Sequence, residues 1–201
     1  MITIVDYGMG NLGSIRNMFK RIGASARISA DPADLENAEK ILLPGVGAFD
    51  GAMERINTGG FHDVLNRKAL VEKIPILGIC LGMQLLTRSS EEGRLPGLGW
   101  IAAETRRFHA SPGLKVPHMG WNSVSRSGDG ALTAGLDPDA RYYFAHSLYV
   151  RVDREEDSVL RASHGIIFDA AIAHGNIYGA QFHPEKSHRF GMQLLSNFAR
   201  L

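Results

Sequence analysis

Residues 78–86 of the chain read "GICLGMQLL" and join an apolar strand pattern to an apolar helix pattern. The first five, Gly78 to Gly82, follow the spacing G-x-C-x-G around Cys80. This spacing is typical of a nucleophile elbow, with cysteine in the place of serine. Glycine suits the positions beside the nucleophile because the turn from strand to helix is tight and strained. The stretch therefore predicts an α/β sheet that carries a reactive side chain at its edge.

An elbow would lift the Cys80 sulfur out of the sheet edge and direct the start of a helix toward it, which favours thiolate over thiol. The alternative is a buried structural cysteine, because lone cysteines usually lie in the core. The flanking glycines, with a strand before them and a helix after, favour the nucleophile.

The residues before the elbow alternate between strand and helix patterns. Strands are predicted at "ITIVDY", "ARIS", "KILL", where Pro44-Gly45 stops the strand, and "PILGI". Helices are predicted from Leu12 to Ile22 with Gly23 as the end, from Asp31-Pro32, and over residues 50–57 and 61–72. This order predicts a parallel sheet with helices on both faces.

After about Trp100 the pattern changes to short strand-like runs separated by turn signals. Examples are "WNSVS", "YYFAHSLYV", "GIIFDAAIA" and "NIYGAQF". A last helix carries Phe190, Leu194, Phe198 and Leu201 on one face. We therefore expect one domain over residues 1–201, with a three-layer α/β/α fold, a mostly parallel central sheet and an antiparallel or mixed extension.

The composition excludes several classes of protein. Of 201 residues, 44% are hydrophobic and 21% charged, and the net charge of +1 predicts no broad attraction to nucleic acid or to an anionic membrane. The start of the chain does not resemble a signal peptide, and the longest uncharged apolar stretch, residues 74–87, is too short and broken to span a bilayer. The single cysteine permits no internal disulfide, so a cytoplasmic location is expected.

A cysteine nucleophile needs a base and a group that orients the base. His183 and Glu185 follow the strand pattern "NIYGAQF", in the segment "QFHPEKS". If that strand lies beside the Cys80 strand, both side chains emerge at the same carboxyl edge of the sheet, where α/β sites form. The alternative for this segment is a surface turn.

The chemistry also needs backbone N–H groups that face a developing oxyanion. One is the N–H of Leu81, which follows the nucleophile. Gly45, Val46 and Gly47, in "PGVGAF" after the third strand, are candidates for others because glycine lets the backbone turn inward. Taken by itself, this segment is better explained as an ordinary glycine-rich connection.

Taken together, these segments resemble the class I glutamine amidotransferases, which use a Cys-His-Glu triad. Among them, the resemblance is strongest to the glutaminase subunits of imidazole glycerol phosphate synthase. The matching segments occur in the same order and span nearly the whole chain: "VDYGMGNL", "LPGVGAF", "LGICLGMQLL", "SEEG", "VPHMGWN", "YFAHSLYV" and "YGAQFHPEKS".

The resemblance implies a role for each matching residue. Cys80 attacks the side-chain amide of L-glutamine, His183 transfers protons, and Glu185 orients the imidazole. Gln84 and Glu92 recognise the α-amino and α-carboxylate ends of glutamine, and Ser147 and Leu148 contribute backbone contacts. Family members often carry an aromatic residue in place of Leu148, so only a side-chain contact is in doubt there. Neither a cofactor nor a metal is implied.

The family also implies a partner. Ammonia passes to a (β/α)₈ cyclase subunit in a heterodimer, which forms imidazole glycerol phosphate and AICAR in histidine biosynthesis. The positions that match partner-facing residues are Gly8, Met9, Gly10, Asn11, His118, Met119, Gly120, Trp121, Asn122 and Lys186. Two alternatives stay open: a cyclase-like partner in sugar amination for surface polysaccharide, and a stand-alone cysteine hydrolase.

One further motif supports a competing function. "GMGNLG", Gly8 to Gly13, has the spacing G-x-G-x-x-G of a dinucleotide-binding turn, and Asp31 lies near the position of the acidic residue that such a site needs. However, Asp31-Pro32 equally indicates the start of a helix. A non-catalytic nucleotide-binding module therefore remains the alternative from another class.

Overall fold

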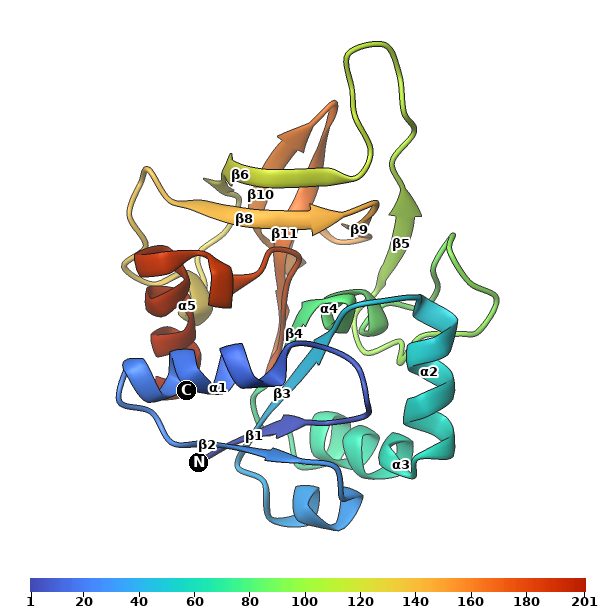
Figure 1. Cartoon of the computed structure of the whole chain (residues 1–201), viewed down its shortest axis with the longest axis vertical. Helices are drawn as coiled ribbons and strands as arrows, with labels where there is room; N and C mark the ends of the chain where they lie inside the picture. The colour runs from blue at the N-terminus through green and yellow to red at the C-terminus, as the bar shows by residue number, and fades with distance from the viewer.

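Five parallel strands form the base of the fold (Figure 1). A computed structural model describes all 201 residues. The strands lie in the order β2 (Ala26–Ser29), β1 (Ile2–Val5), β3 (Lys40–Gly45), β4 (Ile76–Cys80) and β12 (Ile177–Ala180), and each neighbouring pair is parallel. All residues of β1, β4 and β12 are buried, as strands covered on both faces require. The predicted parallel sheet is therefore confirmed.

Helices cover both faces of these strands. Figure 1 shows α1 (Leu12–Arg21) and α5 (His188–Arg200) to the left of the strands, and α2 (Phe49–Thr58) and α3 (Phe61–Asn66) to the right. The chain continues after α3 in a π-helical turn, η2 (Arg67–Val71). Each side has its own apolar core: Phe19 and Phe198 belong to one, and Phe49 and Phe61 to the other. The elbow helix α4 (Leu81–Leu85) completes the expected α/β order.

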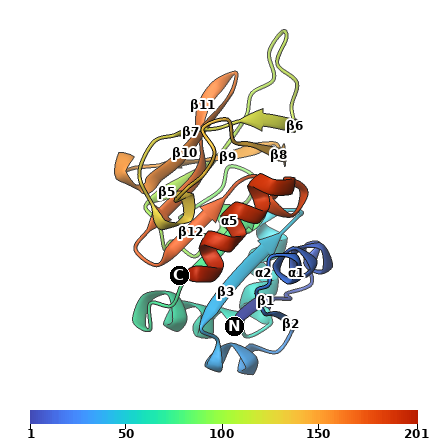
Figure 2. The ribbon, with the colours of Figure 1, turned by 90° about the vertical axis from the view of Figure 1, so that its left-hand side faces the viewer.

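The rest of the chain forms the antiparallel extension, which lies above the parallel half in Figure 2. β11 (Ile166–His174) pairs with β12, and β10 (Ser158–His164) and β7 (Ser125–Arg126) follow. β9 (Leu148–Val152) pairs with β11 and with β5 (Ala103–Arg107), which gives ten strands in one sheet. β6 (His118–Ser123) and β8 (Arg141–His146) form a separate antiparallel pair. Short 3₁₀ turns complete the chain: η1 (Pro32–Asn37), η3 (Ala131–Thr133), η4 (Glu155–Asp157) and η5 (Pro184–Lys186).

Three details differ from the sequence prediction. "YYFAHSLYV" is not one strand, because the chain turns at Ser147 and β8 and β9 join different sheets. The strand at "KILL" does not stop before Pro44-Gly45, since both residues still pair with the end of β4. Leu201 lies beyond the end of α5 and is exposed, so it is not part of the buried face of that helix.

The strand order matters most for the site. β12 lies directly beside β4, with Ala180 opposite Ile79, although the two strands are far apart in the sequence. Because the pair is parallel, the residues that follow both strands emerge at the same edge of the sheet. The segment "QFHPEKS" therefore begins next to Cys80.

Candidate active site

Cys80 is the last residue of β4 and has an unusual backbone conformation. Its φ is 54° and its ψ is −112°, a strained combination for a residue with a side chain. A Cβ on Gly82 would lie 1.8 Å from the carbonyl oxygen of Leu43, and one on Gly78 would lie 2.5 Å from the carbonyl oxygen of Gly82. Both glycines of the G-x-C-x-G spacing are therefore steric requirements of the turn.

His183 and Glu185 form a buried pair at the same edge of the sheet as Cys80, and Cys80 is near enough to influence the His183 ring. The Nδ1 atom of His183 lies 2.9 Å from Oε1 of Glu185, and the two side chains are only 5% and 3% exposed. The second carboxylate oxygen of Glu185 is buried with no hydrogen-bond partner in the protein, so the bond to His183 is the one that orients both side chains. Because Nδ1 faces the carboxylate, Nε2 is the ring atom left for exchange of a proton with Cys80.

The protonation of His183 is shifted by its two neighbours. Burial is the largest single influence and lowers the pKa of His183, but hydrogen bonding and charge from Cys80 and Glu185 together outweigh it and raise the pKa to about 9. A side-chain hydrogen bond to Cys80 is the largest of the raising contributions. The imidazole is therefore held as a cation between a sulfur atom and a carboxylate.

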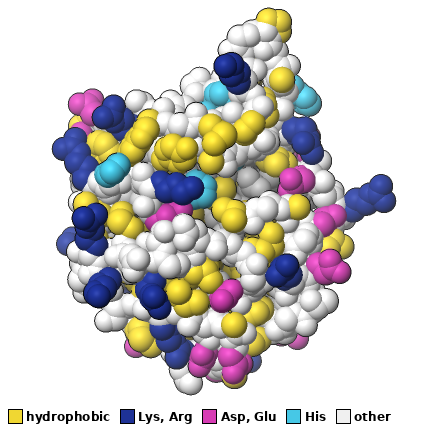
Figure 3. Space-filling model, in the orientation of Figure 1, with side chains coloured by type: hydrophobic (Ala, Val, Ile, Leu, Met, Phe, Trp, Pro, Cys, Tyr) yellow, Lys and Arg dark blue, Asp and Glu magenta, His cyan; other side chains and the backbone are white.

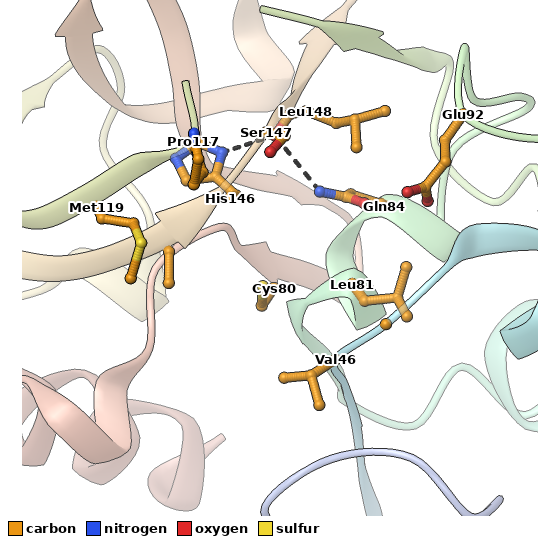
Figure 4. A pocket seen from close by; sticks show the side chains of 12 residues that line it. Val46, Cys80, Leu81, Gln84, Glu92, Pro117, Met119, His146, Ser147 and Leu148 are labelled. Carbon is orange, nitrogen blue, oxygen red and sulfur yellow. Dashed lines mark hydrogen bonds between the residues drawn. The ribbon is translucent and has the colours of Figure 1, made fainter. Parts of the chain in front are cut away.

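Cys80 opens into a pocket of about 330 Å³ (Figure 4). Figure 4 shows the Cys80 side chain between the elbow helix, the loop that carries Val46, and the strands that carry Met119 and His146. The pocket is lined by all four positions predicted to bind substrate and by most of those predicted to hold an oxyanion. The lining residues from these two sets are Val46, Gly47, Leu81, Gln84, Glu92, Ser147 and Leu148.

Polar side chains form one wall of the pocket. The Nε2 atom of Gln84 donates to the carbonyl oxygen of Leu148 at 3.5 Å and to Oε1 of Gln181 at 3.2 Å. Gln181 is fully buried, and its Nε2 lies 3.9 Å from the Cys80 sulfur. Sequence reasoning missed Gln181, although it stands two residues before His183. Glu92 accepts a hydrogen bond from the Phe49 N–H at 2.8 Å through one oxygen.

The loop of residues 45–47, which is predicted to stabilise an oxyanion, lies close to both the elbow and the segment of residues 7–10. Tyr7 donates its hydroxyl proton to the Pro44 carbonyl at 2.6 Å, and a Cβ on Gly45 would lie 2.5 Å from that hydroxyl. Gly47 has a φ of 120°, and a Cβ there would lie 2.5 Å from the terminal methyl of Met9. Glycine is therefore required at both positions. Burial, and the nearby charge of Cys80, raise the pKa of Tyr7, so its hydroxyl remains a donor.

Most residues predicted to face a partner lie around this edge. The loop of Gly8, Met9, Gly10 and Asn11 packs against the loop of residues 45–47, and Asn11 also caps α1. On β6, Met119 and Trp121 are 64% and 44% exposed. Gly120 and Asn122 are half-buried, and the Lys186 ammonium lies 5.7 Å from the centre of the Tyr143 ring. Figure 3 shows hydrophobic side chains gathered over β6 and β8, with basic and histidine side chains beside them.

The side chain of one residue predicted to face a partner points away from this edge. The His118 side chain is buried, so the expectation that it faces a partner is wrong for this side chain. The reason is the alternation of β6: His118 points inward, whereas Met119 and Trp121 point outward.

The dinucleotide motif lacks the geometry that such a site needs. Asp31 accepts a hydrogen bond from the Ala33 N–H at 2.9 Å, so its side chain caps η1. A Cβ on Gly13 would have no atom within 4 Å, whereas the third glycine of a dinucleotide motif is needed for close packing of helix on strand. The spacing in "GMGNLG" therefore has no structural counterpart.

None of the helices combines the length and the apolar character that crossing a bilayer requires.

A parallel sheet with a strained cysteine elbow and a buried His–Glu pair at one edge is the arrangement that the resemblance to the class I amidotransferases predicts. Residues 3–201 match the glutamine amidotransferase class-I family, and the chain belongs to that family. A solved structure described as a glutamine amidotransferase superposes with a TM-score of 0.77 at 17% identity, covering 100% of this chain and 99% of that one.

More specific relatives share far more of the sequence. The chain is 47% identical to imidazole glycerol phosphate synthase subunit HisH 2 of Pseudomonas aeruginosa, over 100% of both chains. It is 50% identical to subunit HisH 2 of Methanococcus maripaludis, over 100% of this chain and 99% of that one. A third relative, subunit HisH of Bdellovibrio bacteriovorus, is 47% identical over the full length of both.

Proposed function

We propose that the chain is the glutaminase subunit of an imidazole glycerol phosphate synthase. It hydrolyses L-glutamine to glutamate and ammonia, and the ammonia passes to a cyclase subunit in histidine biosynthesis. Full-length similarity to HisH subunits supports the pathway. The observation that carries the chemistry is the position of Cys80, strained at the elbow and open to the pocket, with the His183–Glu185 pair buried beside it.

In the proposed reaction, the Cys80 thiolate attacks the side-chain amide carbon of glutamine. The C–N bond breaks as His183 gives its Nε2 proton to the leaving nitrogen, so ammonia departs and a thioester remains on Cys80. His183 then removes a proton from water, whose oxygen attacks the thioester, and the sulfur leaves with glutamate as the product. Glu185 holds the ring orientation through Nδ1 in both steps.

Charge develops on the amide oxygen during each attack, and backbone N–H groups are proposed to stabilise it. Leu81 supplies one N–H at the start of α4, and the loop of Gly45, Val46 and Gly47 supplies another from the opposite wall of the pocket. A loop whose N–H groups point away at rest would give low activity until the partner binds, and we propose such low basal activity here.

The far end of glutamine is charged and needs matching groups. Glu92 uses one carboxylate oxygen for the Phe49 N–H, which leaves the other for the α-ammonium group. Gln84 and the backbone of Ser147 and Leu148 are proposed to complete recognition of the α-amino and α-carboxylate ends, since all three line the same pocket.

The proposed partner is a HisF-like (β/α)₈ cyclase that forms a heterodimer with this chain. It would cover the edge formed by the loop of residues 8–11, by residues 119–122 of β6 and by Lys186. The exposed apolar side chains of Met119 and Trp121 at this edge are typical of an interface core. A cytoplasmic location is part of the same proposal, because it follows from the pathway.

The decisive experiment compares wild type with Cys80→Ser in the presence of a histidine-pathway cyclase and its ligand. We expect the variant to lose imidazole glycerol phosphate formation from glutamine while formation from free ammonium is retained. Half-exposed His62→Gln is the control and is expected to retain both reactions. Retained glutaminase activity in Cys80→Ser would rule out this nucleophile. If no histidine-pathway cyclase stimulates glutamine hydrolysis, the proposed partner is wrong, but the proposed glutaminase reaction still stands.

A further inference from the structure

Two buried histidines beside the pocket have no role in the proposed reaction. His118 on β6 and His146 on β8 occupy directly opposed positions of the antiparallel pair. Both side chains are buried, and His118 Nδ1 lies 2.9 Å from His146 Nε2. His146 also lines the pocket that contains Cys80, so this pair extends from the pocket into the interior of the antiparallel half.

The partners of the pair determine where each proton lies. His146 Nδ1 is 2.6 Å from the Leu148 carbonyl oxygen, which can only accept, so Nδ1 carries the proton. With a neutral ring, His146 Nε2 then has a lone pair and accepts from His118 Nδ1. At the other end, Asn122 Nδ2 lies 3.1 Å from His118 Nε2 and also donates to the Ser163 carbonyl at 2.9 Å. That second bond fixes the orientation of the amide, so His118 Nε2 must accept.

One arrangement of protons therefore satisfies every contact. The hydrogen bonds run from Asn122 to His118, from His118 to His146, and from His146 to Leu148, with both rings neutral and protonated on Nδ1. A proton added to His118 Nε2 would face the donating amide of Asn122, and one added to His146 Nε2 would face the donating Nδ1 of His118. Burial also lowers the pKa of His118 to about 4 and that of His146 to about 3, which agrees with neutral rings.

The chain of hydrogen bonds ends at a structurally important oxygen. The Leu148 carbonyl accepts from both His146 Nδ1 and Gln84 Nε2, and the two dashed lines in Figure 4 meet there. Leu148 begins β9, one residue after the Ser147 turn that separates the two sheets. Two donors on one carbonyl fix the direction of that peptide, and with it the wall of the pocket formed by residues 146–148.

We propose that His118 and His146 are positioning residues that act as a directed pair of neutral imidazoles and fix the Ser147–Leu148 wall and the Gln84 amide for recognition of glutamine. This inference rests on the proposed function of the pocket. The pair does not touch the reacting atoms, so its loss should weaken glutamine binding more than it slows the chemical step.

Variants at residue 146 test the inference in the complex with a cyclase. Phenylalanine keeps an aromatic ring but cannot donate to Leu148, so His146→Phe is expected to raise the KM for glutamine about tenfold with a much smaller change in kcat. In His146→Asn the amide NH₂ occupies the place of Nδ1 and can still donate, so a KM near that of wild type is expected. His164→Phe is the matched control, because the His164 ring stacks on His118 at 4.2 Å but donates separately to the Lys115 carbonyl.

Nitrogen-15 NMR of the full chain reads the protons directly and does not depend on whether a variant folds. Both rings of wild type are expected to be neutral and protonated on Nδ1 at pH 7.5. A ring protonated on Nε2, or an unchanged KM in His146→Phe, would overturn the positioning role while wild-type activity remains normal. Absence of glutaminase activity in wild type with its cyclase would instead overturn the proposed function itself.

Discussion

Replacement of Glu185 by glutamine should lower the pKa of His183. The substitution keeps the size of the side chain and an oxygen that can accept from Nδ1, but it removes the negative charge that lies 2.9 Å from the ring. Both side chains are almost completely buried, so water screens their interaction little. Burial, which opposes the imidazolium, would then be countered only by Cys80 and by a weaker hydrogen bond to a neutral oxygen.

The size of the change follows from the strength of this hydrogen bond. A hydrogen bond to a charged group contributes about 1.5–3 kcal/mol, and about 1.4 kcal/mol corresponds to one pH unit. The pKa of His183, raised to about 9 in wild type, should therefore fall to between about 7 and 8 in Glu185→Gln.

Because the pKa of His183 is raised in the folded state, it also determines how the stability of the fold depends on pH. A folded-state pKa above the usual value of about 6.5 for histidine stabilises the fold fully below that pH, and this stabilisation is lost as pH rises through about 9. In Glu185→Gln, where the pKa of His183 is lower, less stabilisation should be lost as pH rises, and the loss should be complete at a lower pH.

Titration of the His183 ring by NMR measures this pKa in the isolated chain. In the complex with a cyclase, the alkaline fall in kcat/KM should move by the same amount, because the leaving nitrogen needs the proton of His183. Asp157→Asn is the control, since Asp157 pairs with the half-exposed His174 at 3.0 Å and leaves Cys80 untouched. A His183 pKa in Glu185→Gln within about half a pH unit of wild type would refute the reasoning, because the charge of Glu185 would then not hold the proton.

Three further predictions concern stability. Gly82→Ala should destabilise the fold by about 3 kcal/mol or more in urea denaturation, because its Cβ would lie 1.8 Å from the Leu43 carbonyl oxygen. The control is Gly51→Ala in α2, where a Cβ would have no atom within 4 Å, and it should stabilise the fold by about 0.5–1 kcal/mol. Equal effects of the two substitutions would contradict the steric argument. Tyr7→Phe should cost about 1–3 kcal/mol by the same measurement, because the buried Pro44 carbonyl loses its donor, and an unchanged midpoint would show that the bond contributes nothing. Burial is the main cause that lowers the pKa of His118 to about 4, and the electrostatic influence of His164 adds to it. Between pH 6.5 and 4 the unfolded chain therefore binds a proton that the folded chain does not, and stability falls as pH falls. His118→Asn should reduce this loss of stability at low pH but not abolish it, because the pKa of His146 is also lowered, by burial and by His118, His164 and His183. Urea denaturation at several pH values measures the loss. The same dependence of stability on pH in wild type and variant would contradict the prediction.

Local sequence patterns were enough to predict most of the helices and strands of the parallel half, and the elbow. Alternation of strand and helix is a local pattern, so β1 to β4 and their helices were predicted nearly element by element, whereas β12 was grouped with the later extension. The clash that Gly78 avoids is also local, because it lies within the turn, whereas the clash that Gly82 avoids is with Leu43 on the adjacent strand and follows from the packing. The order of matching segments indicated the family, and the family comparison confirms it.

Which strands pair, and which side chains therefore surround Cys80, depends on the tertiary structure. Nothing local indicates that β12 pairs with β4, yet this pairing brings His183 and Gln181 to Cys80. The turn at Ser147 also lacks a glycine or proline to mark it, and it arises because β8 and β9 have different pairing partners.

The burial of His118 has the same origin. A strand pattern gives the alternation of side chains but not which face meets the core, and only the packing of β6 settles that. Hydrogen-bond partners across a sheet are set by register and by long-range packing, which local sequence patterns do not encode. The sequence therefore specified the reactive groups, and the fold alone specified the distances between them.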